Sequence, residues 1–271
     1  MDIVLRNFFR LLRSGAFSIN EPLEPMSFFK WRRLYQMIEV QNVADVFACG
    51  IAHHLKEEGI NIPNDILRLV SVDSVYHPSF KELTLREVSM STGVLTQRFY
   101  KILNGEYHSI DTSVETIDLL KLLIVNEQDF LYHGINMKGI ILLGCYLREK
   151  GEFVDFVKLD AWLNRLFLRR IAQLQGSILI SVFGFETEEL PFVYRKELEA
   201  FKLVEYSVRN LAKDTAQEWH FRQTRTGFVS NNSTMLFRSI RRSIRYLPYA
   251  PIETISSFFK SLLKGLKEIE E

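Results

Sequence analysis

Cysteine is scarce in this sequence, which contains only Cys49 and Cys145 among its 271 residues. The two lie far apart and form no CxxC pair, and each falls in an apolar stretch with helical spacing. Free cysteines in such stretches behave as small buried hydrophobic residues, whereas disulfides belong to oxidising compartments. We therefore expect two buried free thiols in a reducing compartment rather than a disulfide.

The sequence also lacks a long apolar run. A helix that spans a bilayer needs about 20 consecutive apolar residues, and no window of the chain approaches that length. Near the N-terminus, Arg6, Arg10 and Arg13 interrupt the apolar residues, which excludes the continuous apolar segment of a signal peptide and indicates an amphipathic helix. These absences predict a cytoplasmic protein with no transmembrane segment.

Neither sign of charge predominates, since 34 lysines and arginines face 33 aspartates and glutamates, giving a net charge of +1. No overall field therefore favours a nucleic acid or a membrane surface, and we do not expect the chain to bind nucleic acid. The hydrophobic content of 47% is ample for a core. The chain is long enough for one large domain or two smaller ones.

The motifs of common catalytic and metal sites are missing. His53 and His54 are adjacent in sequence, so they point to different sides of a helix and cannot bind one ion; we expect them at the surface or its boundary. His133 is expected to end a helix, and His220 has no acidic or thiol neighbour in sequence. No GxSxG sequence and no cysteine in a charged setting offers a nucleophile. The sequence thus predicts no catalytic, cofactor-binding or metal-binding residue.

What the sequence does contain is helical periodicity, most clearly at 113–150. Apolar residues at helical spacing follow Ser113, a favourable N-cap, and a second such run begins after Gly134. Gly134 and Gly151 are each expected to end a helix in the left-handed conformation that glycine adopts easily. The stretch predicts two buried helices joined by a sharp turn.

Comparable patterns along the rest of the chain predict an all-α protein, an irregular multi-helix bundle of about nine or ten helices with short connectors. Residues 1–112 would form an N-terminal helical part and 113–271 a C-terminal helical part, or both would form one continuous domain. A strand is the alternative to a helix at 178–183. Outside 113–150, the expected helices lie at 3–12, 27–38, 42–51, 64–72, 78–103, 156–172, 178–183, 197–211, 234–246 and 253–270, with Ser14-Gly15 and Asn104-Gly105 ending two of them.

The strongest local departure from balanced charge is at 219–247, which carries six arginines and no acid. Guanidinium groups among aromatic residues can bind phosphates, anionic lipid or an acidic protein surface. The alternative, which the near-balanced overall charge favours, is that they pair with acids at 186–199 or lie along a solvated helix face. The candidate residues for binding a partner or an anion are Arg222, Arg225, Arg238, Arg241, Arg242 and Arg245.

Several segments resemble a bacterial family of uncharacterised nucleotidyltransferases. GINMK at 134–138, FVKLDAWL at 156–163 and LPF at 190–192 resemble its C-terminal helical part. FFRLLRSGAF at 8–17 and WRRLY at 31–35 resemble the helices that open such proteins. The resemblance implies a small mixed-sheet catalytic core between the helical parts, with a Gly-Ser turn and two aspartates in a D-x-D arrangement that hold divalent ions.

That catalytic core is missing from this sequence, which contains no D-x-D; between 59 and 113 it carries only a short polar segment whose acids lack the spacing. No catalytic residue can be carried over. The resemblance therefore implies a non-catalytic helical binding or scaffold protein, a pseudoenzyme without a cofactor. It would contact an unknown protein partner or acidic surface through 222–245 and the terminal helix, and it could form a homo-oligomer.

Two other functions stay open from the sequence. One is a divergent nucleotide-binding protein or transferase that uses a pocket between the helices. The other is peripheral membrane attachment through 3–13 or 253–270, although both segments fit a core or an oligomer interface better.

Overall fold

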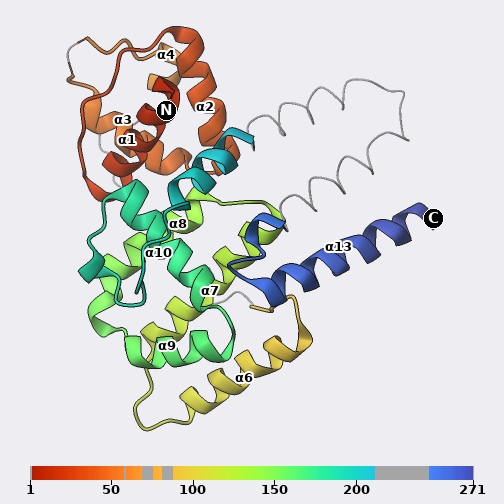
Figure 1. Ribbon diagram of the computed structural model, residues 1–271. Coiled ribbons are helices and arrows are strands. Elements are labelled where there is room, and N and C mark those ends of the chain that lie inside the picture. The colour runs from red at the N-terminus through yellow and green to blue at the C-terminus, as the bar shows by residue number, and fades with distance from the viewer. Residues whose placement is uncertain (1, 58, 69–75, 81–87, 211–243, 271) are drawn as a thin grey trace.

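The computed structural model describes residues 2–57, 59–68, 76–80, 88–210 and 244–270, and these form helices and turns without a strand (Figure 1). The predicted all-α class is confirmed. Two 3-10 turns are η1 (Gly151–Phe153) and η2 (Thr187–Glu189), and residues 200–210 are also helical. The α-helices are α1 (Ile3–Phe17), α2 (Phe28–Gln41), α3 (Ala44–His54), α4 (Asn64–Leu67), α6 (Gly93–Tyr107), α7 (Val114–Tyr132), α8 (Met137–Lys150), α9 (Phe156–Arg165), α10 (Arg169–Phe183) and α13 (Pro251–Glu270).

Helix α7 lies at the centre of the core. It buries residues on nearly all of its faces and packs against α8, α9, α10 and α13. Ser113 occupies its N-cap, and Gly134 has a φ of +91° just after its end, so the helix pair predicted at 113–150 is confirmed. Gly151 ends α8 as predicted, but the predicted left-handed conformation is wrong, because this glycine has a φ of −57° and begins η1.

Helices α1 and α3 approach each other more closely than side chains would allow. Gly15 of α1 and Gly50 of α3 each face the backbone of the other helix. A Cβ atom at Gly15 would lie 1.9 Å from the carbonyl oxygen of Val46, and one at Gly50 would lie 2.2 Å from that of Leu11. The absence of a side chain at both positions therefore permits this contact between helix backbones.

Two predicted helix boundaries in this region are wrong. Gly15 does not end the first helix, since α1 continues to Phe17 and takes Ser18, with a φ of 56°, as its C-cap. Asn42 does not begin the third helix, because with a φ of 51° it is the left-handed C-cap of α2. Asparagine adopts this conformation more readily than most residues, so it can end a helix as well as begin one.

The single helix predicted at 78–103 is also wrong. Residues 88–92 are not helical, and α6 begins after Thr92, whose hydroxyl accepts a hydrogen bond from the Leu95 backbone N–H (3.2 Å). The helix then continues through Gly105, where the sequence predicts its end. A side-chain cap rather than a proline or glycine sets the start of α6.

The helix predicted at 156–172 is two helices. Phe167 adopts a φ of 58° between α9 and α10 and so turns the chain, although it is neither glycine nor asparagine. Residues 178–183 belong to α10, which confirms the helix over the strand, and Gly184 ends it in the left-handed conformation (φ 70°).

Other expected helices fall only partly within the described chain. The helix predicted at 64–72 is shorter in the structure, because α4 ends at Leu67 and Arg68 lies in a turn; residues 69–75 lie outside the described residues. The helix predicted at 197–211 begins at 200, three residues later than predicted, and is described as far as 210. The helix predicted at 234–246 is described only at its last three residues. The terminal helix predicted at 253–270 is confirmed as α13.

A buried amide network joins α7, α8 and α10. Asn126 donates from Nδ2 to the carbonyl of Gly139 (3.1 Å) and to Oε1 of Gln175 (3.1 Å). Gln175 donates from Nε2 to the carbonyl of Leu123 (2.9 Å). A Cβ at Gly139 would lie 2.2 Å from Asn126 Oδ1, so the glycine makes room for the amide. The network fixes how the three helices are rotated against one another.

Replacing Asn126 with alanine is expected to destabilise the protein by about 1–3 kcal/mol, because Gln175 Oε1 and the Gly139 carbonyl would lose their donor in the dry core. Urea unfolding followed by circular dichroism measures the effect. Asn104→Ala, at an exposed position of α6, is the matched control and should change the free energy of unfolding by less than about 0.5 kcal/mol. Equal stability of the two variants would contradict a structural role for the network.

The N-terminal and C-terminal helical parts pack on one another. The Phe17 ring lies 5.4 Å from the Phe183 ring and 5.2 Å from the Phe185 ring, between centroids. Gln41 Oε1 accepts a buried hydrogen bond from the Met137 N–H (2.8 Å). Buried apolar residues of both parts belong to one hydrophobic cluster, from which α13 runs outward to the C-terminal end (Figure 1). The domain boundary at 112–113 stays a prediction.

Candidate functional site

Of the six arginines that the sequence singles out, the structure describes one. Arg222, Arg225, Arg238, Arg241 and Arg242 lie outside the described residues. Arg245 is half-buried, and its Cζ lies 3.6 Å from the centre of the Tyr206 ring. Its guanidinium therefore makes a cation–π contact within its own chain.

The acids proposed as internal partners for the arginines have other cations beside them. Glu189 pairs with Arg148 at 3.1 Å and Glu197 with Arg170 at 3.7 Å, while Glu199 pairs with its own helical neighbour Lys202 at 2.9 Å. These pairs lie at the surface, where each contributes little to stability. These three acids therefore have cationic partners outside the arginine segment.

Helix α13 turns polar residues toward the core and apolar residues toward solvent. Glu253, Thr254 and Ser257 are buried, with Glu253 only 2% exposed. Ile255 and Phe259 are 49% and 55% exposed on the other side of the helix. This is the reverse of the usual arrangement, in which a surface helix buries its apolar stripe.

The inward face of α13 is attached by hydrogen bonds to the segment before α6. Glu253 accepts bonds from the backbone N–H of Ser91 and from the N–H (3.2 Å) and hydroxyl (3.1 Å) of Thr92. Ser256 donates from its hydroxyl to the Ser91 carbonyl (2.9 Å). As a carboxylate in the first turn of α13, Glu253 also complements the positive end of the helix dipole.

A second carboxyl group, that of Glu127 on α7, lies in the same buried region. Its side chain is 0% exposed, and neither oxygen has a hydrogen-bond partner among the residues described. Burial raises the pKa of Glu127 well above its ordinary value, and the nearby charge of Glu253 raises it further. The protonated, neutral form of Glu127 is therefore favoured.

Glu127 is not among the candidate residues predicted from the sequence. A signal was present, because Glu127 shares a helix face with Leu120, Leu123, Ile124 and Leu131, which lie three, four or seven residues away. An acid within such a stripe must be buried if the stripe packs against the core.

The structure also contains a pocket of about 770 Å³ at the N-terminal end of the molecule. It lies between α1, α2 and the helix at 200–210, over an apolar floor that includes Val4 and Leu5. The charged residues that line it are Asp2, Arg32, Arg33, Glu39 and Arg209. Because Arg33 pairs with Asp2 at 3.3 Å, part of this charge is already neutralised.

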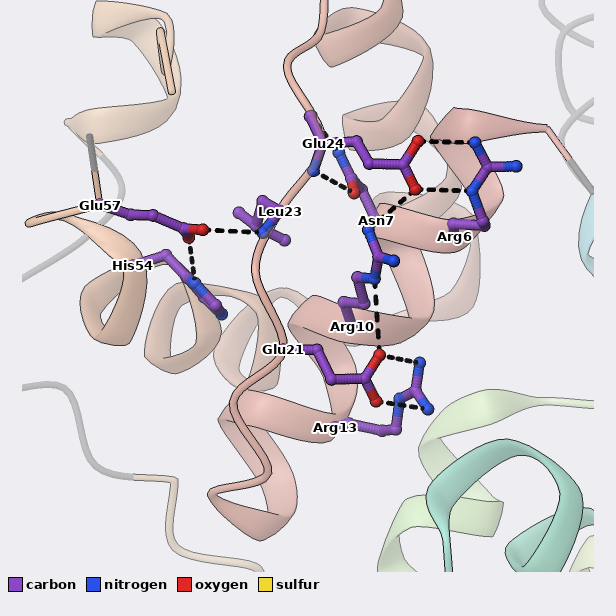
Figure 2. Close-up of polar contacts among 9 residues, drawn as sticks. All are labelled: Arg6, Asn7, Arg10, Arg13, Glu21, Leu23, Glu24, His54 and Glu57. Carbon is purple, nitrogen blue, oxygen red and sulfur yellow. Dashed lines mark hydrogen bonds and ion pairs between the residues drawn. The ribbon is translucent and has the colours of Figure 1, made fainter. Parts of the chain in front are cut away.

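Figure 2 shows that the arginines of α1 hold the connector that follows this helix. Glu24 accepts two bonds from Arg6 (2.6 Å each) and one from Arg10 (2.9 Å), while Glu21 pairs with Arg13 at 2.8 Å. The hydrogen bonds from Arg6 lower the pKa of Glu24 to about 2. The apolar face of α1 is buried in the core, so residues 3–13 offer no membrane-binding face.

The adjacent histidines point apart, as predicted, but only one of them is exposed. His53 Nδ1 lies 3.0 Å from the Ser14 hydroxyl, whereas His54 is buried with Nδ1 2.7 Å from Glu57 Oε2. Both histidines were predicted at the surface or its boundary; His54 is buried at the edge of the core, where Glu57 provides a polar partner (Figure 2). Among the described residues, no three His, Cys, Asp or Glu side chains lie together so that they could hold a metal ion.

Both cysteines are free, as the sequence predicts. Cys49 is buried, and Cys145 is half-buried. Burial raises the pKa of the Cys145 thiol to about 12 and also raises that of Cys49. Thiols with such pKa values carry little thiolate and are poor nucleophiles at neutral pH.

No helix in the described parts of the chain is both long and apolar enough to cross a membrane.

The chain was compared with protein-family models, with curated proteins and with solved structures, and none of them matches it.

Proposed function

We propose that this chain is a non-catalytic helical binding or scaffold protein that contacts a partner protein through the outward face of α13. The single observation that carries the proposal is the reversed orientation of α13, with Ile255 and Phe259 exposed while Glu253 is buried. A polar face bonded to the core holds the helix so that its apolar face stays available.

The surface just before α13 is also apolar. Ile244 and Leu247 are both exposed in the segment that leads into the helix. A group of exposed apolar side chains at one end of a protein favours contact with another apolar surface. Helical partners commonly recognise anchors at positions i, i+3 and i+7, which Ile252, Ile255 and Phe259 provide.

The non-catalytic part of the proposal rests on the sequence. It lacks the D-x-D pair of the family that it resembles, and it has no serine or cysteine nucleophile motif. Only the helical parts of the chain resemble that family, and helical parts without a catalytic core fit a binding role.

Quantitative co-purification from the native cell tests the proposal. The double variant Ile255→Lys/Phe259→Lys is expected to lose, by at least about tenfold, a protein that the wild-type chain retains, because two charges would have to be desolvated at the contact. The control is Lys260→Ala, in the same helix but away from the apolar stripe. The proposal is rejected if the wild type and the double variant retain the same proteins in equal amounts while both fold.

The arginine segment remains a separate prediction from the sequence. Reversing the charges of Arg238, Arg241 and Arg242 should weaken the same interaction if this segment contributes to it. Unchanged binding by a folded variant would restrict the contact to α13.

A second candidate function, a divergent nucleotide-binding protein or transferase, is favoured by the pocket beside α2. Its arginines and its apolar floor are suited to a ligand with an anionic and an aromatic part. A nucleotide at about 100 times its dissociation constant should stabilise the fold by about 2.7 kcal/mol in a thermal-shift assay with Mg²⁺ or Mn²⁺. Arg32→Glu should abolish the shift, and the absence of a shift with every nucleotide would exclude this candidate.

A further inference from the structure

The apolar positions of α13 follow the spacing of a coiled coil. Six of its eight apolar residues (proline and glycine not counted) are separated by intervals that alternate between three and four residues, which is the pattern of positions a and d in a heptad repeat, while Phe258 and Leu263 fall beside these positions. These positions are Ile252, Ile255, Phe259, Leu262, Leu266 and Ile269. We refer to these six residues as the α13 seam.

The described side chains agree with this register. The first three residues of the α13 seam are exposed, whereas the buried residues Glu253, Thr254 and Ser257 occupy positions b, c and f on the opposite side. The helix continues without interruption to Glu270, about 30 Å from its start. Figure 1 shows α13 leaving the body of the protein toward the C-terminal end.

We propose that the α13 seam pairs with the α13 seam of a second copy of this chain, a step that rests on the proposed binding role of α13. In coiled coils, charges at positions e and g select a partner of a different sequence. In α13 the only charged residue at an e or g position is Glu270. The remaining e and g positions are occupied by Pro251, Ser256, Phe258, Leu263 and Gly265. Two identical helices can therefore meet along the seam without repulsion between rows of like charges.

The charge of α13 favours a protein helix over a lipid surface. Its three lysines, Lys260, Lys264 and Lys267, are balanced by three glutamates, Glu253, Glu268 and Glu270, so the helix has no net charge. Helices that lie on anionic membranes instead carry an excess of lysine and arginine. The described Lys260 occupies position b, beside the attachment to the core rather than beside the seam.

The helix itself gains from a partner. Gly265 lies in its interior and lowers helix stability by about 1 kcal/mol relative to alanine. A helical segment of this length that extends from the core is marginal in water unless one face packs against another element. Pairing along the seam supplies that packing symmetrically to both copies, as a two-fold dimer requires.

Sedimentation velocity over about 1–100 μM tests the proposal. The wild-type chain is expected to shift from its monomer mass of 31.8 kDa toward twice that mass as concentration rises. The seam variant Ile255→Lys/Leu262→Lys should weaken self-association by at least about tenfold. Lys260→Ala/Lys264→Ala, at the charged positions b and f, is the matched control and should dimerise like the wild type. Circular dichroism and thermal melting establish that every variant is folded.

The outcomes separate this inference from the proposed function. A wild-type chain that stays monomeric but retains another protein through Ile255 and Phe259 overturns self-pairing and leaves the binding role intact. A monomer that retains no protein overturns both. Another outcome is a wild-type chain that stays monomeric and floats with phosphatidylcholine–phosphatidylserine vesicles, while the seam variant does not float. That result assigns the seam to lipid and also overturns the pairing. If the seam variant dimerises as tightly as the wild type, pairing through the α13 seam is also overturned.

Discussion

Replacing Glu127 with glutamine is expected to stabilise the protein increasingly as the pH rises. Glu127 is buried without a hydrogen bond to any described residue and close to the charge of Glu253. Its pKa is therefore higher in the folded chain than in the unfolded chain, where the ordinary value of 4.5 applies. Glutamine has nearly the same shape and cannot ionise, so the variant removes this difference.

The sign follows from proton binding. Between the two pKa values the folded chain holds a proton that the unfolded chain has released, so wild-type stability is complete below pH 4.5 and falls as the pH rises through the folded-state pKa. The loss is about 1.4 kcal/mol for each pH unit in that interval. For a domain of this size, each kcal/mol corresponds to roughly 2–4 °C in Tm.

Thermal melting of both proteins from pH 4 to pH 9 measures this effect. The difference in Tm should be small at pH 4 and should grow to several degrees at high pH. Glu188→Gln, at an exposed position, is the control and should follow the wild type. A difference that is constant across the range would show that Glu127 does not exchange a proton on folding.

Replacing Gly15 with alanine is expected to have the largest effect among single methyl additions to this protein. The new Cβ would lie 1.9 Å from the Val46 carbonyl oxygen, which belongs to a helix backbone and cannot rotate away. Helices α1 and α3 would have to separate, which costs about 3 kcal/mol or more. We expect Tm to fall by roughly 10 °C, with Gly50→Ala giving a comparable loss for the reciprocal reason.

Gly105→Ala is the matched control for this prediction. Gly105 also lies within a helix, but nothing approaches within 4 Å of the place that its Cβ would occupy. Alanine there should stabilise α6 by about 0.5–1 kcal/mol, because it favours the helix over the unfolded chain. If Gly15→Ala were as stable as Gly105→Ala, the close contact between α1 and α3 would be absent in solution.

Apolar periodicity was sufficient to predict the helical class and the helix pair at 113–150. In that stretch the local signals agree, since Ser113 occupies the N-cap position of the first helix and Gly134 follows its end with a positive φ. When capping, turn and core positions all indicate the same boundaries, tertiary contacts need only preserve them.

Boundaries were mispredicted where a residue serves a tertiary purpose. Glycine is common at helix ends, which is why Gly15 was predicted to end the first helix. The backbone of Val46 lies so close that only glycine fits at this position inside α1. Phe167 turns the chain in a left-handed conformation that its residue type does not predict. The sequence contains no local record of either requirement.

Apolar spacing predicted the terminal helix of the candidate site, whereas its contact with a partner stays a proposal. Periodicity does not tell which face of this helix meets the core. The orientation depends on Glu253, which reaches the backbone of Ser91 and Thr92 more than 160 positions earlier in the chain. Such a long-range pairing leaves no pattern in a single sequence.

The attachment of α13 by hydrogen bonds also determines how it can detach. Releasing the first turns of α13 from Ser91 and Thr92 would transfer chiefly polar groups to water. Exposure of polar groups does not produce the positive heat-capacity change that accompanies unfolding of an apolar core. Helix α13 can therefore open as a local unit, with its amides exchanging hydrogen before those of α7, while the rest of the core remains folded.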